Sequence, residues 1–118
     1  GSTAEEVSAE CGRLESSGEE RMVILVRGFG IGPGLSEDVS LVRDIRARAL
    51  AGDRNLRHPV MADVSGCWSR GFADARLASM QEAESALAAM MAGADMVIVR
   101  GPGAADMARV YGEELADL

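Results

Sequence analysis

Five side chains in this sequence lie at or just beyond the ends of short apolar runs, where polar and aromatic groups can carry chemistry. Two of them are arginines: Arg27 follows residues 22–26 and Arg100 follows residues 96–99. A guanidinium group binds phosphate or carboxylate through paired hydrogen bonds, so both could hold an anion or a carboxylate of a partner. The other three belong to a run over residues 60–64 and the segment after it, and are Asp63, Ser65 and Trp68.

A glycine-rich segment, residues 28–34, suggests a second kind of site. Glycine lets a ligand approach the backbone closely and a helix is expected just beyond, so one interpretation is a phosphate-binding loop. Its binding residues would be Gly30, Gly32 and Gly34. The other interpretation, a structural turn, is the one we favour. No lysine follows as in a P-loop, and the carboxylates of Glu37 and Asp38 stand where the phosphate would bind.

Trp68 lies in a long irregular segment, residues 65–78, which also contains Phe72. Long loops after the carboxyl end of a strand are often functional, and an exposed tryptophan is costly without a purpose. Trp68 either closes the mouth of the sheet or offers a flat apolar face to a planar ligand or a partner. Both interpretations stay open at this point.

The sequence shows no nucleophile paired with a base. Cys67 and Asp63 are the groups that an enzyme would have to use, and catalytic residues stay unassigned. The only histidine, His58, precedes a proline in a polar loop, where we expect a surface position. Cys11 and Cys67 lie on unrelated segments without a Cys-x-x-Cys motif, so we expect free thiols and no metal site.

Three strands and three helices must position these side chains. The apolar runs predict strands near residues 22–27, 60–64 and 95–99, and helical spacing predicts helices near residues 36–51, 79–92 and 104–116. This βαβαβα order is typical of an α/β domain with a parallel sheet of three or slightly more strands and flanking helices. Ligands of such sheets bind at the carboxyl ends of the strands.

The expected core follows from the same patterns. A strand that is apolar at every position, such as residues 96–99, needs cover on both faces. Residues 79–82 have the spacing of a capping box, with Ser79 and Glu82 as its two members. From the apolar faces of the predicted strand and helices we expect five residues to be buried, namely Ile45, Leu87, Met90, Met91 and Ile98.

The N-terminal part differs from the rest. Gly1-Ser2 has the look of an expression remnant, and Thr3 with Glu6 can form a capping box for a helix over residues 3–16. Its apolar stripe is narrow, so the helix packs either on the domain or on a partner. We assign residues 1–20 to this helix and a linker, and residues 21–118 to the α/β domain.

Composition excludes several classes of partner. The 118 residues carry a formal net charge of −7 and only 3% aromatic residues. An acidic surface does not attract nucleic acid or an anionic membrane, so neither is an expected partner. No apolar run is long enough to span a bilayer and no signal peptide is visible, which predicts a cytoplasmic protein.

Several segments together resemble the small, or delta, subunit of the corrinoid iron–sulfur protein of the carbon monoxide dehydrogenase/acetyl-CoA synthase system. The resemblance covers roughly residues 30–118. Its pieces match, in order and spacing, the last strands of that family's (β/α)₈ barrel. They are Gly32-Pro33-Gly34, Val42 to Arg46, Ala49 to Asp53, Leu56, Pro59-Val60, Asp63-Val64, Trp68, Ala92 to Asp95, Val99-Arg100 and Pro102.

The resemblance implies a place in one-carbon metabolism. In that family the barrel pairs with a large subunit carrying the corrinoid, and its carboxyl face helps to shelter the cobalt that transfers a methyl group. Three strands cannot close an eight-stranded barrel, so the chain is either completed by another chain or is a small domain that reuses the unit. The large subunit's cysteine motif is absent, so this chain should hold no iron–sulfur cluster.

Three functional hypotheses follow. The first is a corrinoid-protein-related subunit of methyl transfer, which contacts the corrinoid together with a partner subunit; there Asp63 would hydrogen-bond a ring nitrogen or an amide. The second is a non-catalytic α/β assembly or ligand-binding module whose sheet edges and methionine-rich helices serve subunit contacts. The third, which we favour least, is a small enzyme. Under the first two we expect a homo-oligomer or a complex with a partner subunit.

Overall fold

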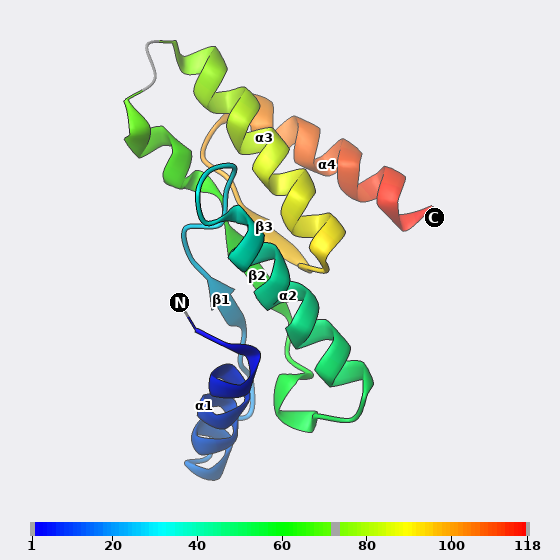
Figure 1. Ribbon diagram of the computed structural model, residues 1–118. Coiled ribbons are helices and arrows are strands. Elements are labelled where there is room, and N and C mark those ends of the chain that lie inside the picture. Colours follow the sequence, from blue (N-terminus) through cyan, green and yellow to red (C-terminus); the bar gives the residue numbers. More distant parts are fainter. Residues whose placement is uncertain (1, 72–73, 118) are drawn as a thin grey trace.

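The computed structural model describes residues 2–71 and 74–117 (Figure 1). Its helices are α1 (Ala4–Ser16), α2 (Leu35–Leu50), α3 (Ala75–Ala92) and α4 (Pro102–Ala116). Its strands are β1 (Ile24–Val26), β2 (Val60–Asp63) and β3 (Met96–Ile98), and two 3₁₀ turns are η1 (Arg54–Leu56) and η2 (Ser65–Arg70). None of the helices in these residues is both long and apolar enough to cross a membrane.

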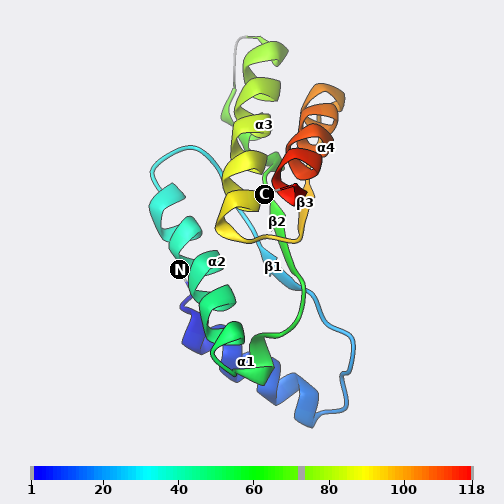
Figure 2. The ribbon, with the colours of Figure 1, turned by 90° about the vertical axis from the view of Figure 1, so that its right-hand side faces the viewer.

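The three strands form one parallel sheet in the order β1-β2-β3, which confirms the expected mixed α/β architecture. Leu25 pairs with Met61, and Met61 pairs in turn with Met96. Strands that follow each other in this order are joined by right-handed crossovers, so both connecting helices lie on the same face of the sheet. Figure 2 shows α2 and α3 on one side of the strands, with α4 packed beside α3.

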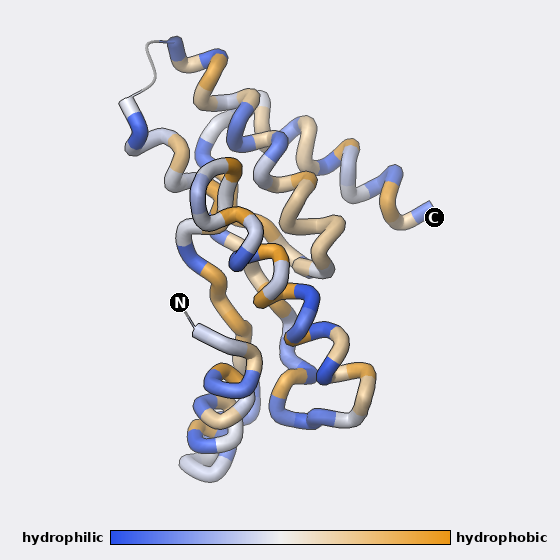
Figure 3. The backbone as a smooth tube through the Cα atoms, in the orientation of Figure 1, coloured by the Kyte–Doolittle hydropathy of each residue, from blue (hydrophilic) through white to orange (hydrophobic). Residues whose placement is uncertain are grey.

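The covered face of the sheet carries the core. Alternate strand residues point toward α2 and α3, and the apolar run along β1 is visible in Figure 3. Val42 and Ile45 of α2 are fully buried, so the expected burial of Ile45 is confirmed. The core cluster joins these two to small and β-branched residues, namely Ile24, Val26, Val60, Ala62, Ala86 and Ala89.

The opposite face of the sheet, called the open face below, has no cover from the described residues. Its apolar members are Leu25, Met61, Met96 and Ile98. Ile98 is 38% exposed, and the prediction that it is buried is wrong. Both crossover helices lie on the other face, and β3 is an edge strand, so Met96 and Ile98 have strand neighbours only on β2. Residues 96–99 are apolar at every position without being covered on both faces.

Two helical residues also differ from the expected core. Met91 is 70% exposed, so its predicted burial is wrong as well, and Leu87 and Met90 are half-buried. The positions of α3 that face the sheet and α2 belong to alanines such as Ala86 and Ala89. Side chains this small let α3 approach closely, and the methionines are displaced toward the rim.

Helix α3 begins earlier than expected. Asp74 caps it by accepting a hydrogen bond from the backbone N–H of Arg76 at 2.8 Å, and η2 occupies part of the segment predicted to be irregular. Ser79 and Glu82 therefore lie inside the helix and form no capping box. Phe72 and Ala73 of the expected loop lie outside the described residues.

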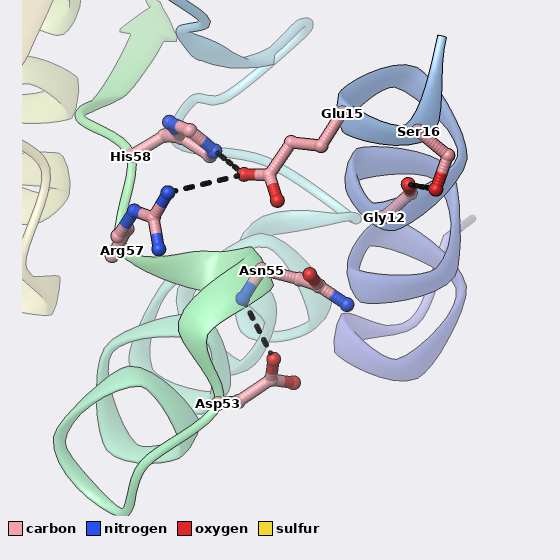
Figure 4. A network of polar contacts seen from close by, with 7 residues as sticks. All are labelled: Gly12, Glu15, Ser16, Asp53, Asn55, Arg57 and His58. Carbon is pink, nitrogen blue, oxygen red and sulfur yellow. Dashed lines mark hydrogen bonds and ion pairs between the residues drawn. The ribbon is translucent and has the colours of Figure 1, made fainter. Parts of the chain in front are cut away.

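Helix α1 packs against η1 and α2 at the amino ends of the strands (Figure 4). Half of its predicted capping box is present: Thr3 Oγ1 accepts a hydrogen bond from the Glu6 backbone N–H, while the Glu6 carboxylate accepts one from the Thr3 hydroxyl. His58 is 6% exposed and its Nε2 lies 2.8 Å from Glu15 Oε1, so the expected surface position of His58 is wrong. The polar residues around His58 in the sequence did not reveal this partner, because Glu15 lies 43 residues away along the chain.

Candidate functional site

The carboxyl ends of the three strands meet at one edge of the sheet, and the predicted binding residues lie along it. Asp63 ends β2 and is paired in register with Ile98 of β3, while Arg27 follows directly after β1. Arg27 and Arg100 are exposed, and neither forms an ion pair within residues 2–71 and 74–117. This edge thus presents two guanidinium groups, neither of them ion-paired within the described residues, on either side of one carboxylate.

Asp63 is held in place by its neighbour. Its Oδ1 accepts hydrogen bonds from the backbone N–H of Ser65 at 3.0 Å and from Ser65 Oγ at 2.6 Å. This local turn starts η2 and fixes the carboxylate at the end of the open face. In the described part of the chain Oδ2 has no such partner, so Asp63 can still accept one hydrogen bond from a ligand. Ser65 is a positioning residue in this arrangement.

Trp68 fills the space between η2 and the loop after β3. The guanidinium of Arg100 lies 5.6 Å from the centre of its ring, a cation–π distance. A Cβ at Gly101 would come within 2.8 Å of Trp68 Cζ2, so the ring also presses on this loop. The geometry favours the interpretation of Trp68 as the residue that closes the mouth of the sheet.

The glycine-rich loop is tied to its surroundings. The N–H of Ile31 donates to Ser85 Oγ at 3.0 Å, and its carbonyl accepts from Arg70 and Gln81, each at 2.7 Å. A Cβ at Gly32 would come within 2.7 Å of the Arg70 guanidinium, and its φ of 150° also favours glycine. These contacts support the structural turn, because both backbone groups of Ile31 at the centre of the loop already bond to protein.

The N-terminus of α2 gives little help to a phosphate at Gly30, Gly32 or Gly34. Gly34 caps the helix without a side-chain hydrogen bond, and Glu37 and Asp38 occupy its first turn. Partial burial, and then the charge of Glu37, raise the pKa of Asp38. An incoming phosphate would add to this concentration of negative charge.

A cavity of about 140 Å³ separates the loops that follow β1 and β2. Cys67 lines it, is 6% exposed, and donates through Sγ to the carbonyl of Ala78 at 3.5 Å. Burial, followed by the charge of Glu82, raises the pKa of Cys67. The thiol is therefore protonated near neutral pH, which is the opposite of what a nucleophile needs.

The most constrained group at this edge is one that the sequence interpretation assigned to a helix cap. Glu82 of α3 is fully buried, and its two oxygens accept from the backbone N–H groups of Arg100 at 2.7 Å and Gly101 at 2.8 Å. Ser85 and Gln81 on the same helix hold Ile31. Three polar residues within an alanine-rich helix were the available signal, because each needs a partner when buried.

Within the described ranges, no group of three or more histidine, cysteine, aspartate or glutamate side chains could hold a metal ion. Comparison of the chain with known protein families, with curated proteins and with solved structures found no match.

Proposed function

We propose that this chain is a subunit of a methyl-transfer assembly of one-carbon metabolism, and that it places its strand carboxyl ends against a corrinoid carried by a larger subunit. The observation that carries the proposal is the open sheet face, which ends in Arg27, Asp63 and the Trp68–Arg100 pair. Helices on one face only, with strands in sequential order, are the arrangement of a barrel segment, as the resemblance to the delta subunit implies.

The residues present fit a contact with the rim of a corrinoid and do not fit its enclosure. A cavity of about 140 Å³ is far smaller than the ring. A corrinoid carries amide side chains around its rim. Arg27 and Arg100 could donate to their oxygens, and Asp63 Oδ2 could accept from an amide nitrogen. The cobalt of the bound corrinoid supplies the methyl-carrying chemistry, and this chain orients the ring and excludes water from one side.

Cobalamin titration tests the proposal, since Trp68 is the single tryptophan and reports on this edge. We expect saturable quenching of its fluorescence by hydroxocobalamin, corrected for absorption with free tryptophan amide, and none by ATP. Arg27→Met should weaken the quenching, while Arg43→Met on the exposed face of α2 should not. Absence of saturation, or equal effects of the two variants, would contradict the proposal.

A non-catalytic assembly module is the second candidate. It is favoured by the protonated, buried thiol of Cys67 and by the internal stacking of Trp68, because neither side chain is then free to react with a ligand. A partner subunit that binds this chain equally well with and without cobalamin, and independently of Arg27, would support this candidate over the first.

A further inference from the structure

Strand β1 is an edge strand with unpaired backbone groups. The N–H of Ile24 donates to the carbonyl of Pro59 at 2.8 Å, on the side of β2. Backbone groups of successive strand residues point in opposite directions, so the N–H and C=O of Leu25 point away from the sheet. No described strand lies on that side, because β2 is the only neighbour of β1.

A continuous groove follows this edge. One hollow of about 640 Å³ lies between β1 and α1, and a second of about 220 Å³ lies between β1 and α2. Both are lined by Ser2, Val7, Ile24 and Leu25, so they adjoin each other along the strand. The lining combines apolar side chains with polar and charged ones, and it runs beside the unpaired edge of β1, where an extended chain can add as a strand.

The rim of the groove on the helical side is acidic. Glu6 lines its amino end, and Glu37 and Asp38 line its carboxyl end, where Arg27 on the strand side also lines the groove. None of the three carboxylates forms an ion pair within the part of the chain that the structure describes. Asp38 is partly buried beside Glu37. A cation placed there would offset the free-energy cost of burying the Asp38 charge and the repulsion between the two carboxylates.

We propose that this groove binds an extended segment of a partner protein as an added strand of the sheet, with alternating apolar and basic side chains. Its backbone pairs with the outward groups of Leu25. Its basic side chains point toward Glu6, Glu37 and Asp38. Its apolar side chains point the other way and continue the open face next to Leu25.

In the register centred on Ile24, a second copy of this chain fits the edge poorly. Its own edge segment carries Arg21 and Arg27 at either end, and Val23 and Leu25 between them face the same side by alternation. An antiparallel pairing of two such segments about Ile24 would place Arg21 of one copy opposite Arg27 of the other. Like charges directly opposite each other destabilise a strand pair.

The test uses a fluorescently labelled peptide of four Val-Lys repeats, and a control peptide of four Val-Glu repeats. We expect saturable binding of the Val-Lys peptide and none of the control. Glu37→Lys should weaken binding at least fivefold. Glu114→Lys on α4, which changes the net charge equally and is exposed, should leave it within twofold of the original chain.

Amide hydrogen exchange supplies the backbone readout. In the free chain the Leu25 amide should exchange fast, and the Val-Lys peptide should slow its exchange while the Glu114 amide is unaffected. Equal weakening by the two charge reversals, or no protection of Leu25, would overturn the proposal by showing attraction to net charge alone. A free chain that sediments as a dimer with Leu25 already protected would also overturn it, in favour of a second copy.

Discussion

At the scale of single residues, Glu82 organises the carboxyl edge without being free to react. Both of its oxygens accept backbone N–H groups, and one of these belongs to Gly101, the cap of α4. A carboxylate at this place also complements the positive end of the helix. Its neighbours Arg100 and Trp68 are thereby fixed, so Glu82 positions the candidate site from inside the molecule.

Replacing Glu82 should therefore destabilise the fold strongly. Glu82→Ala leaves two buried N–H groups without an acceptor, and we expect a loss of about 2–4 kcal/mol in the free energy of unfolding. Glu82→Gln keeps the size and one good acceptor, so its loss should be smaller. Urea unfolding followed by circular dichroism measures both; an alanine variant as stable as the original chain would show that water replaces the carboxylate.

The thiol of Cys67 gives a prediction in pH. Burial and the nearby Glu82 charge raise its pKa, so the reactive thiolate forms at a higher pH than in an unperturbed cysteine. In a Cys11→Ser background, the rate of alkylation by iodoacetamide should rise with pH later than it does for the unfolded chain. Adding Glu82→Gln removes the negative charge and should shift the profile to lower pH. Identical profiles for folded and unfolded chain would contradict this.

At the scale of elements, α1 is held by a few polar contacts. Glu15 binds the buried His58 (Figure 4), and Ser8 Oγ donates to Asp53 Oδ2 at 2.7 Å. Glu15→Ala leaves His58 without this partner, so we expect faster amide exchange throughout α1 and a loss of about 1–3 kcal/mol. Glu5→Ala, at an exposed position of the same helix, is the control and should change neither. Unchanged exchange in α1 would mean that apolar contacts alone hold it.

The strands and their order could be predicted from the sequence, but whether each strand is covered on one face or on both could not. Apolar runs bounded by charged residues, glycine or proline predicted all three strands, and their separation by helices predicted the parallel order. Residues 96–99, however, would look the same in a strand covered on two faces or on one. The difference depends on which side the crossover helices take and on how many strands follow, and neither is written in the run itself.

The site was predictable to a similar degree. Arg27, Asp63 and Arg100 follow strands, and parallel topology brings such positions to one edge. The partners of Glu82 and His58 were not visible, because Gly101 and Glu15 lie 19 and 43 residues away in the chain. Local patterns can show that a polar residue needs a partner, and only the tertiary fold can supply it.

At the scale of the whole molecule, the chain exposes more surface than its mass accounts for. It exposes 7301 Å², whereas a compact monomer of 12.4 kDa exposes about 6,100 Å². Its radius of gyration is 14.9 Å, against about 13.5 Å for a compact domain of this length. The excess exceeds the share of about 800 Å² that each partner contributes to a standard interface. The open face and the β1 groove are the places where such a partner would restore normal burial.

Two isoleucines test whether the open face is covered only in a complex. Ile45 is fully buried and Ile98 is 38% exposed. Ile45→Ala should cost about 2–5 kcal/mol in the free energy of unfolding, while Ile98→Ala should cost only about 1 kcal/mol, because fewer contacts and less buried surface are lost. Urea unfolding at a concentration where the chain sediments as a monomer gives this comparison.

In a complex that covers the open face, Ile98 becomes a contact residue, and Ile98→Ala should weaken association far more than Met91→Ala, an exposed position on α3. Equal costs of the two isoleucine substitutions in the monomer would mean that the chain covers its own sheet, and the case for a partner at this face would fail.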